Sequence, residues 1–135
     1  MALDPQGALV LQTVAMPADT NYNGDIFGGW IMSQMDLGAS IPAYSRARGK
    51  VTTVAVEAMV FHKPVAVGDL VSIYARLVKE GTTSMHIDVE VWSTRRPALE
   101  KIKVTEATFV YVALDENGKK RALPILDSTE SAFLS

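Results

Sequence analysis

The sequence contains no cysteine. That absence excludes disulfide bonds, iron–sulfur clusters and catalysis by a thiol. The chain also lacks a run of about eighteen apolar residues, the length that a membrane-spanning helix needs, so no membrane partner is expected. Its first residues, Met-Ala-Leu-Asp-Pro, lack the basic and apolar regions of a signal peptide. We therefore expect a cytoplasmic protein.

Blocks of like charge are absent as well. The 13 Lys and Arg and the 15 Asp and Glu residues are spread along the chain and leave a net charge of −2. Binding to nucleic acid needs a clustered basic face, so nucleic acid is not an expected partner. The only histidines, His62 and His86, fall on different expected strands without a third ligand at zinc spacing. The surface is the favoured place for both, and no metal site is expected.

The pattern along the 135 residues is that of one domain, with a core from about residue 9 to 124. The tail, residues 125–135, gives no decisive pattern. Alternating apolar and polar residues predict half-buried strands. The expected elements are a strand over Ala8–Met16, a helix over Phe27–Tyr44, and strands over Thr52–Phe61, Asp69–Glu80, Ser84–Ser93 and Lys101–Leu114. Strands that follow a single helix favour an α+β layer with the helix packed on an antiparallel sheet.

The expected helix is apolar on two opposite sides. At about 100° per residue, Ile31 and Met35 lie on one side, and Leu37 and Ile41 lie on the other. We therefore expect a helix buried almost all round, with its end kinked or unwound at Pro42. Between the apolar sides runs a narrow stripe of small and polar residues: Gly29, Ser33, Asp36 and Ser40.

Two features of this helix point to chemistry. The Gly28-Gly29 pair lies at its start, where unpaired backbone N–H groups can hold an oxyanion, and Asp36 can activate water or attack directly. A solvated carboxylate and a glycine pair that serves packing are the structural alternatives. Asn21 is most simply a turn former that can also orient a carbonyl or a water. Glu57, alone in an apolar strand, is either a residue at a dimer edge or a support of the site.

The block Ala15–Asp36 reads Ala-Met-Pro-Ala-Asp-Thr-Asn-Tyr-Asn-Gly-Asp-Ile-Phe-Gly-Gly-Trp-Ile-Met-Ser-Gln-Met-Asp. It resembles the hotdog-fold acyl-CoA thioesterases of the YciA type. The likeness continues through Val54–Phe61, Lys63-Pro64, Val67–Asp69 and Val89–Trp92, and covers most of the chain. It implies an α+β hotdog fold, in which a five- to six-stranded antiparallel sheet wraps a long buried helix.

The resemblance further implies hydrolysis of an acyl-CoA thioester to a carboxylic acid and CoA. Asp36 would be the general base or nucleophile, and the Gly28 N–H, aided by Gly29, would polarise the carbonyl. Related enzymes place an amide where Asn21 stands and a hydroxyl where Ser40 stands. The site would form between two subunits of a homodimer, and three dimers would assemble further. No metal or bound cofactor is implied, since CoA is part of the substrate and product.

One departure concerns the CoA phosphates. After Gly81 many relatives carry Arg followed by Ser-Ser, whereas this chain has Thr82-Thr83-Ser84. The substitute candidates for contacting CoA are Lys63, Ser84, Arg95 and Arg96.

Two other functions compete with hydrolysis. A hotdog module that binds acyl-CoA without cleaving it would not need Asp36. A hotdog dehydratase usually relies on a histidine, and none lies between residues 21 and 40. The acyl-chain preference, and the choice between base and nucleophile for Asp36, stay open.

Overall fold

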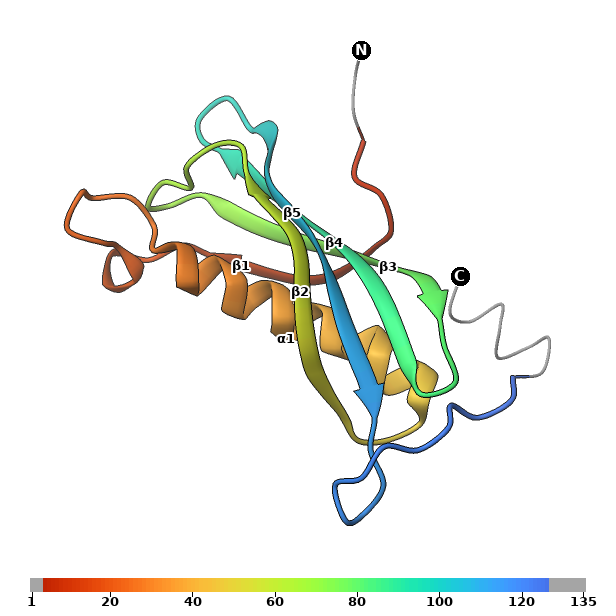
Figure 1. Ribbon diagram of the computed structural model, residues 1–135. Helices are drawn as coiled ribbons and strands as arrows, with labels where there is room; N and C mark the ends of the chain where they lie inside the picture. The colour runs from red at the N-terminus through yellow and green to blue at the C-terminus, as the bar shows by residue number, and fades with distance from the viewer. Residues whose placement is uncertain (1–3, 127–135) are drawn as a thin grey trace.

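A computed structural model describes residues 4–126. Its elements are β1 (Ala8–Val14), a 3-10 turn (Pro17–Asp19), α1 (Gly28–Ala47), β2 (Val51–Phe61), β3 (Leu70–Glu80), β4 (Ser84–Arg95) and β5 (Glu100–Ala113). The strands form one antiparallel sheet in the order β1-β3-β4-β5-β2. Figure 1 shows α1 lying along one face of this sheet, the arrangement expected of a hotdog fold. The expected strands are confirmed, and the sheet has five of them.

The end of α1 differs from the expectation. Pro42 lies inside a helix that continues to Ala47, where Arg48 ends it in the left-handed region at φ 54°. The proline removes one helical hydrogen bond, but contacts with other elements hold the last turn. Arg46 pairs with Glu80 of β3, and Arg121 Nη2 donates to the Ala47 carbonyl at 2.7 Å. The prediction of an unwound end was therefore wrong.

One side of α1 forms the core with the sheet face that packs on it, here called the inner face. Ile31, Met35 and Ala39 are at most 3% exposed. Gly38 permits the close approach, because a Cβ there would lie 3.0 Å from Val10 and 3.1 Å from Ile73. A larger residue at this position would need Val10 or Ile73 to shift by a few tenths of an ångström.

The opposite side of α1 is not covered within one chain. Leu37, Ile41 and Tyr44 are each more than half exposed. The adjacent edge strand β2 also exposes Val54 and Val60. The expected burial of the helix almost all round is therefore not reached within one chain, which leaves apolar side chains of α1 and β2 exposed.

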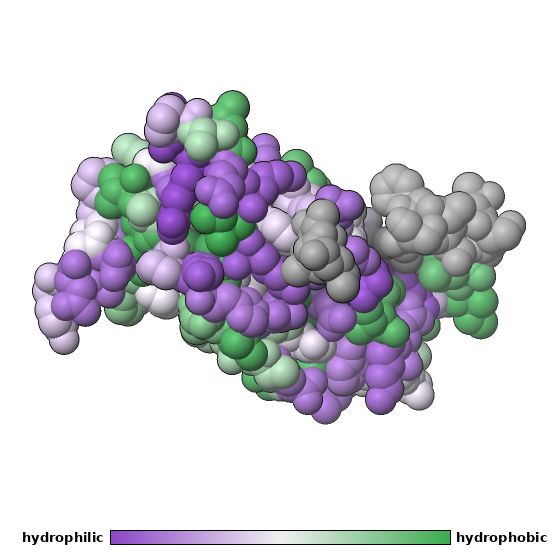
Figure 2. All heavy atoms as spheres, turned by 90° about the horizontal axis from the view of Figure 1, so that it is seen from above, coloured by the Kyte–Doolittle hydropathy of each residue, from purple (hydrophilic) through white to green (hydrophobic). Residues whose placement is uncertain are grey.

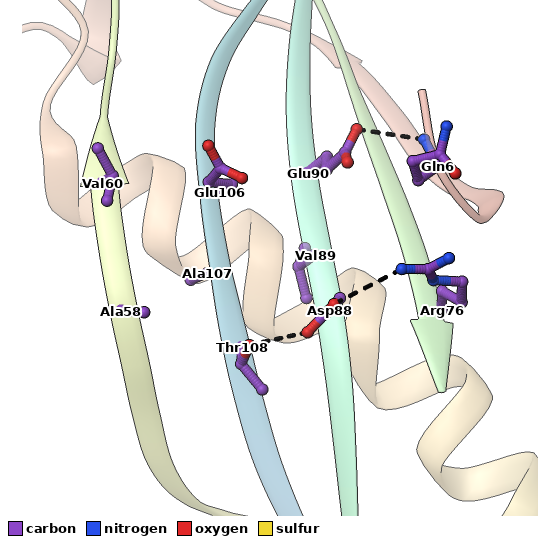
Figure 3. Close-up of a pocket in the computed structure, with 10 residues that line it drawn as sticks. All are labelled: Gln6, Ala58, Val60, Arg76, Asp88, Val89, Glu90, Glu106, Ala107 and Thr108. Carbon is purple, nitrogen blue, oxygen red and sulfur yellow. Dashed lines mark hydrogen bonds and ion pairs between the residues drawn. The ribbon is translucent and has the colours of Figure 1, made fainter. Parts of the chain in front are cut away.

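The other face of the sheet, here called the outer face, is polar. A pocket of about 290 Å³ lies on this face. Figure 3 shows the residues that line it, with α1 behind the sheet. Arg76 and Asp88 both line this pocket. They are partners in the β3–β4 register, and their side chains lie 3.8 Å apart. Figure 2, a view from above Figure 1, shows a surface that is mainly hydrophilic.

Glu57 and His86 also face this side. Their side chains lie 3.6 Å apart, and His86 is half-buried rather than exposed. Glu57 pairs in register with Thr108, a residue of the outer pocket. Glu57 therefore lies on the outer face, whereas Asp36 contacts the inner face. Within one chain, the interpretation of Glu57 as a support of the site is wrong.

Candidate active site

Asp36 projects from the middle of α1 toward β2 and β5 and is half-buried. The Thr53 hydroxyl donates to its Oδ1 at 2.6 Å, and the Tyr111 hydroxyl lies 2.7 Å from the same oxygen. Tyr111 Oη is also 2.8 Å from the Asp36 backbone carbonyl. Thr53 and Tyr111 are partners in the β2–β5 register. The sheet thus positions two neutral hydroxyl groups within hydrogen-bond distance of one oxygen of the Asp36 carboxylate.

Tyr111 is only 1% exposed, and its ring lies nearly parallel to that of Phe109 at 6.5 Å. Burial raises the pKa of Tyr111 well above its ordinary value, and the hydrogen bond to Asp36 and the charge of Asp36 raise it further. The phenol therefore stays protonated at physiological pH and acts as a donor. Sequence reasoning missed both Tyr111 and Thr53. Strand alternation could have placed Tyr111 on the inner face, but nothing local pairs it with a helix residue.

Gly28 and Gly29 form the start of α1. The N–H groups of Trp30 and Ile31 donate to the Phe27 carbonyl, whereas no backbone hydrogen bond uses those of Gly28 and Gly29 in the described part of the chain. A Cβ at Gly28 would meet the Phe61 ring at an ordinary 3.7 Å. Packing within one chain therefore does not require glycine at position 28, which weakens the packing alternative there.

Asn21 lies in the loop that enters α1. Its Oδ1 accepts the backbone N–H groups of Asn23 at 2.9 Å and Asp25 at 3.2 Å, so it is a turn former as expected. These two hydrogen bonds fix the orientation of the side-chain amide. They use only Oδ1, so the Nδ2 group points away from the turn. Ser40, one turn after Asp36, donates its hydroxyl to the Leu37 carbonyl at 2.6 Å.

The candidate CoA contacts divide between the two ends of the molecule. Lys63 is exposed and lines a pocket of about 230 Å³ together with Gly28. Arg96 is exposed beside Asp69. Arg95 is engaged within the chain, because its Nε lies 3.1 Å from Asp69 Oδ2 and its Nη2 donates to the Pro64 carbonyl.

Ser84 stands apart from these basic residues. Ser84 is the first residue of β4 and Arg95 is the last. At about 3.3 Å per residue, the strand separates the two residues by about 35 Å. One chain therefore cannot bring Ser84 and the three basic residues to the same phosphate.

Neither a membrane-spanning helix nor a metal-binding cluster is found in the described part of the chain. No helix there is long and apolar enough to cross a membrane. Residues 4–126 contain no group of three or more His, Asp or Glu side chains that could hold a metal ion.

One long helix packed on a five-stranded antiparallel sheet is the hotdog fold, the fold of a similar solved thioesterase of Campylobacter jejuni that is 37% identical. Residues 23–98 match the model of the Thioesterase superfamily. The chain belongs to this family.

Individual relatives agree with this assignment. The acyl-CoA thioester hydrolase YciA of Salmonella typhimurium is 60% identical over 124 residues, which are 90% of this chain and 93% of that protein. HI0827, a hexameric broad-specificity acyl-coenzyme A thioesterase, is 49% identical with a TM-score of 0.90, over 98% of this chain and 91% of that one.

A more distant structure bears on the site. The acyl-CoA hydrolase of Staphylococcus aureus, solved with coenzyme A and butyryl coenzyme A, is 28% identical with a TM-score of 0.79, over 92% of this chain and 77% of that one. It has also been solved with one asparagine or one aspartate replaced by alanine.

Proposed function

We infer that this chain hydrolyses acyl-CoA thioesters to a carboxylic acid and CoA, with Asp36 as the reacting carboxylate. The observation that carries the inference is the Asp36 side chain, half-buried on α1 and held by two neutral hydroxyls. Moving a carboxylate partly out of water is unfavourable, so a half-buried one in an apolar helix is a candidate for a functional group. In the Staphylococcus aureus relative, the two substituted residues are fifteen positions apart. Asn21 and Asp36 have the same spacing, which supports both assignments.

The distance between Gly28 and Asp36 supports a site that is shared with a second copy of the chain. Eight residues of helix place them about 12 Å apart along the axis, at about 1.5 Å per residue. One thioester carbonyl cannot contact both groups of the same chain. A two-fold axis that sets α1 of one copy beside α1 of the other brings Asp36 of one chain to Gly28 of its partner.

The uncovered surface of the single chain suits this dimer. Leu37, Ile41 and Tyr44 of α1 are 53–59% exposed, and β2 is an edge strand with no neighbour on its outer side in the five-stranded sheet. An apolar region next to an open strand edge favours a protein partner. We propose a homodimer with two shared sites. The hexameric state of HI0827 supports a further assembly of three dimers.

The chemistry follows from the groups gathered in such a site. The Gly28 N–H and the Asn21 amide hold the thioester oxygen as it gains negative charge, while Gly29 and Ser40 border the same site. If Asp36 acts as a base, it takes a proton from water, the water oxygen bonds to the carbonyl carbon, and the C–S bond breaks. The proton then passes to the CoA sulfur. If Asp36 acts as a nucleophile, its oxygen bonds to the carbonyl carbon, the C–S bond breaks and CoA leaves as a thiolate. Water then opens the resulting mixed anhydride, which releases the acid, restores Asp36 and supplies the proton of the CoA thiol. Neither route needs a metal or a bound cofactor.

For CoA itself we propose that Lys63 and Arg96 contact the phosphates, since both are exposed. Arg95 orients the Pro64 segment between them through its bonds to Asp69 and Pro64. Ser84 contacts CoA only if a partner chain brings it near. We further propose that the whole chain is one hotdog domain.

Release of free CoA thiol from a panel of acyl-CoA chain lengths tests the proposal. Wild-type protein should release thiol, and Asp36→Asn should release almost none while still binding CoA. Binding without thiol release by the wild type would identify a non-catalytic module instead. Hydrolysis by Asp36→Asn at the wild-type rate would remove Asp36 from the mechanism.

A further inference from the structure

We propose that Tyr111 and Thr53 are positioning residues for this reaction: their hydroxyls hold Oδ1 of Asp36 and make Oδ2 the oxygen that reacts. The inference rests on the proposed role of Asp36 as the reacting carboxylate. It adds two residues from β5 and β2 to a site otherwise built from α1 and the loop before it.

The geometry places both donors on one oxygen. Thr53 Oγ1 is 2.6 Å and Tyr111 Oη is 2.7 Å from Asp36 Oδ1. A carboxylate oxygen offers two lone-pair directions, so these two donors fill them. Tyr111 has a single hydroxyl hydrogen, and an ionised carboxylate is a stronger acceptor than a backbone carbonyl. The phenol therefore donates to Oδ1, although the Asp36 carbonyl also lies within 2.8 Å.

Packing alone does not explain these hydroxyls. Tyr111 lies in the core beside Phe109 and is 1% exposed, so a phenylalanine would fill the same space without a polar atom to satisfy. Burial keeps the pKa of Tyr111 far above neutrality, so the group remains a donor wherever the enzyme works. Because Thr53 and Tyr111 are register partners, the sheet fixes both donors relative to each other.

The two oxygens of Asp36 consequently have different roles. No hydrogen bond within the described residues reaches Oδ2. Oδ2 is thus the atom that takes the proton from water on the base route, or bonds to the carbonyl carbon on the nucleophile route. Rotation of the carboxylate is restricted by the bonds to Oδ1, which reduces the misalignment that a free side chain would show.

The test uses two nearly isosteric variants, Tyr111→Phe and Thr53→Val, in the full-length assembled enzyme. Each should lower kcat by about 10- to 100-fold with little change in KM. Thr53→Ser should restore most of the kcat lost in Thr53→Val. Tyr74→Phe is the matched control, because its hydroxyl lies near Lys101, away from Asp36, and it should keep the wild-type kcat and KM.

The outcomes separate this inference from the proposed function. Wild-type kcat in Thr53→Val and in folded Tyr111→Phe, with Asp36→Asn inactive, would overturn the positioning role alone. A fall in kcat that Thr53→Ser does not restore would also overturn it, since lost packing rather than a lost hydroxyl predicts that result. If Tyr111→Phe does not fold, half-buried Thr53 still decides the question. Activity retained in Asp36→Asn would instead overturn the proposed function.

Discussion

Arg46 and Glu80 join the last turn of α1 to the end of β3 through two parallel hydrogen bonds. Arg46 Nε lies 2.6 Å from Oε2, Nη2 lies 2.9 Å from Oε1, and Nη1 donates to the Pro124 carbonyl at 2.8 Å. Arg46 is 6% exposed, whereas a third of the Glu80 side chain is exposed. Such a two-point ion pair fixes the angle between the two elements, and it holds the helix beyond Pro42.

Glu80→Gln should therefore lower the free energy of unfolding by about 2 kcal/mol, because it leaves the Arg46 guanidinium buried without a full counter-charge. The partial exposure of Glu80 reduces the loss below that of a fully buried pair. Urea denaturation measures the change. Arg76→Ala is the control, since its partner Asp88 is 3.8 Å away and both side chains are more than two-fifths exposed. It should cost under about 1 kcal/mol, and an equal loss in both variants would contradict the prediction.

The shared site predicts complementation between two inactive chains. Asp36→Asn lacks the carboxylate, and Gly28→Pro lacks the N–H while proline suits the first turn of a helix. Phe27 already has the extended backbone, at φ −62° and ψ 128°, that a residue before proline adopts. Each variant alone should be nearly inactive.

Equal co-expression of these two chains should recover about a quarter of wild-type activity, because half of the dimers contain one intact site of two. Two different affinity tags would verify that mixed dimers form. No recovery in purified mixed dimers would show that each site lies within one chain.

Asn21 should act through its Nδ2 group. Asn21→Asp keeps an oxygen that can accept the N–H groups of Asn23 and Asp25, but it replaces the amide donor. We expect kcat to fall by about 10- to 100-fold, less than in Asp36→Ala, with an unchanged thermal midpoint. Asn21→Ala loses both functions and should also be less stable. Full activity in Asn21→Asp would show that Asn21 only forms the turn and does not contact the substrate.

Glu106 should make stability depend on acid pH. Its pKa is lowered from 4.5, first by the hydrogen bond with His62 and then by that with Lys103. A lowered folded-state pKa means that the stabilisation is present above the unfolded value of 4.5 and is lost as the pH falls through the lower folded value. Urea midpoints across this window should show Glu106→Gln below wild type above pH 4.5, with the gap closing in acid. Because the side chain is 40% exposed, the gap should also shrink in high salt. A gap independent of pH would contradict the linkage.

The sequence by itself determined the order and type of the elements. Alternation in some segments, and apolar or β-branched runs in others, predicted each strand to within two residues at either end, because these patterns are visible in neighbouring residues. The Gly28-Gly29 pair and Asp36 were also identifiable from nearby residues alone. A glycine pair at a helix start and a lone carboxylate in an apolar helix are both local patterns. The block from Ala15 to Asp36 was specific enough to indicate the family.

Only the tertiary structure decided what these elements contact. Thr53 and Tyr111 stand 17 and 75 residues from Asp36 in the chain, and the sheet register alone brings their hydroxyls to one oxygen. The helix continues past Pro42 because Glu80 and Arg121, distant in sequence, hold its last turn. Glu57 falls on the face opposite Asp36 through pairing with β5. Each of these contacts depends on how two distant segments of the chain are placed relative to each other. No local pattern of residues determines that placement.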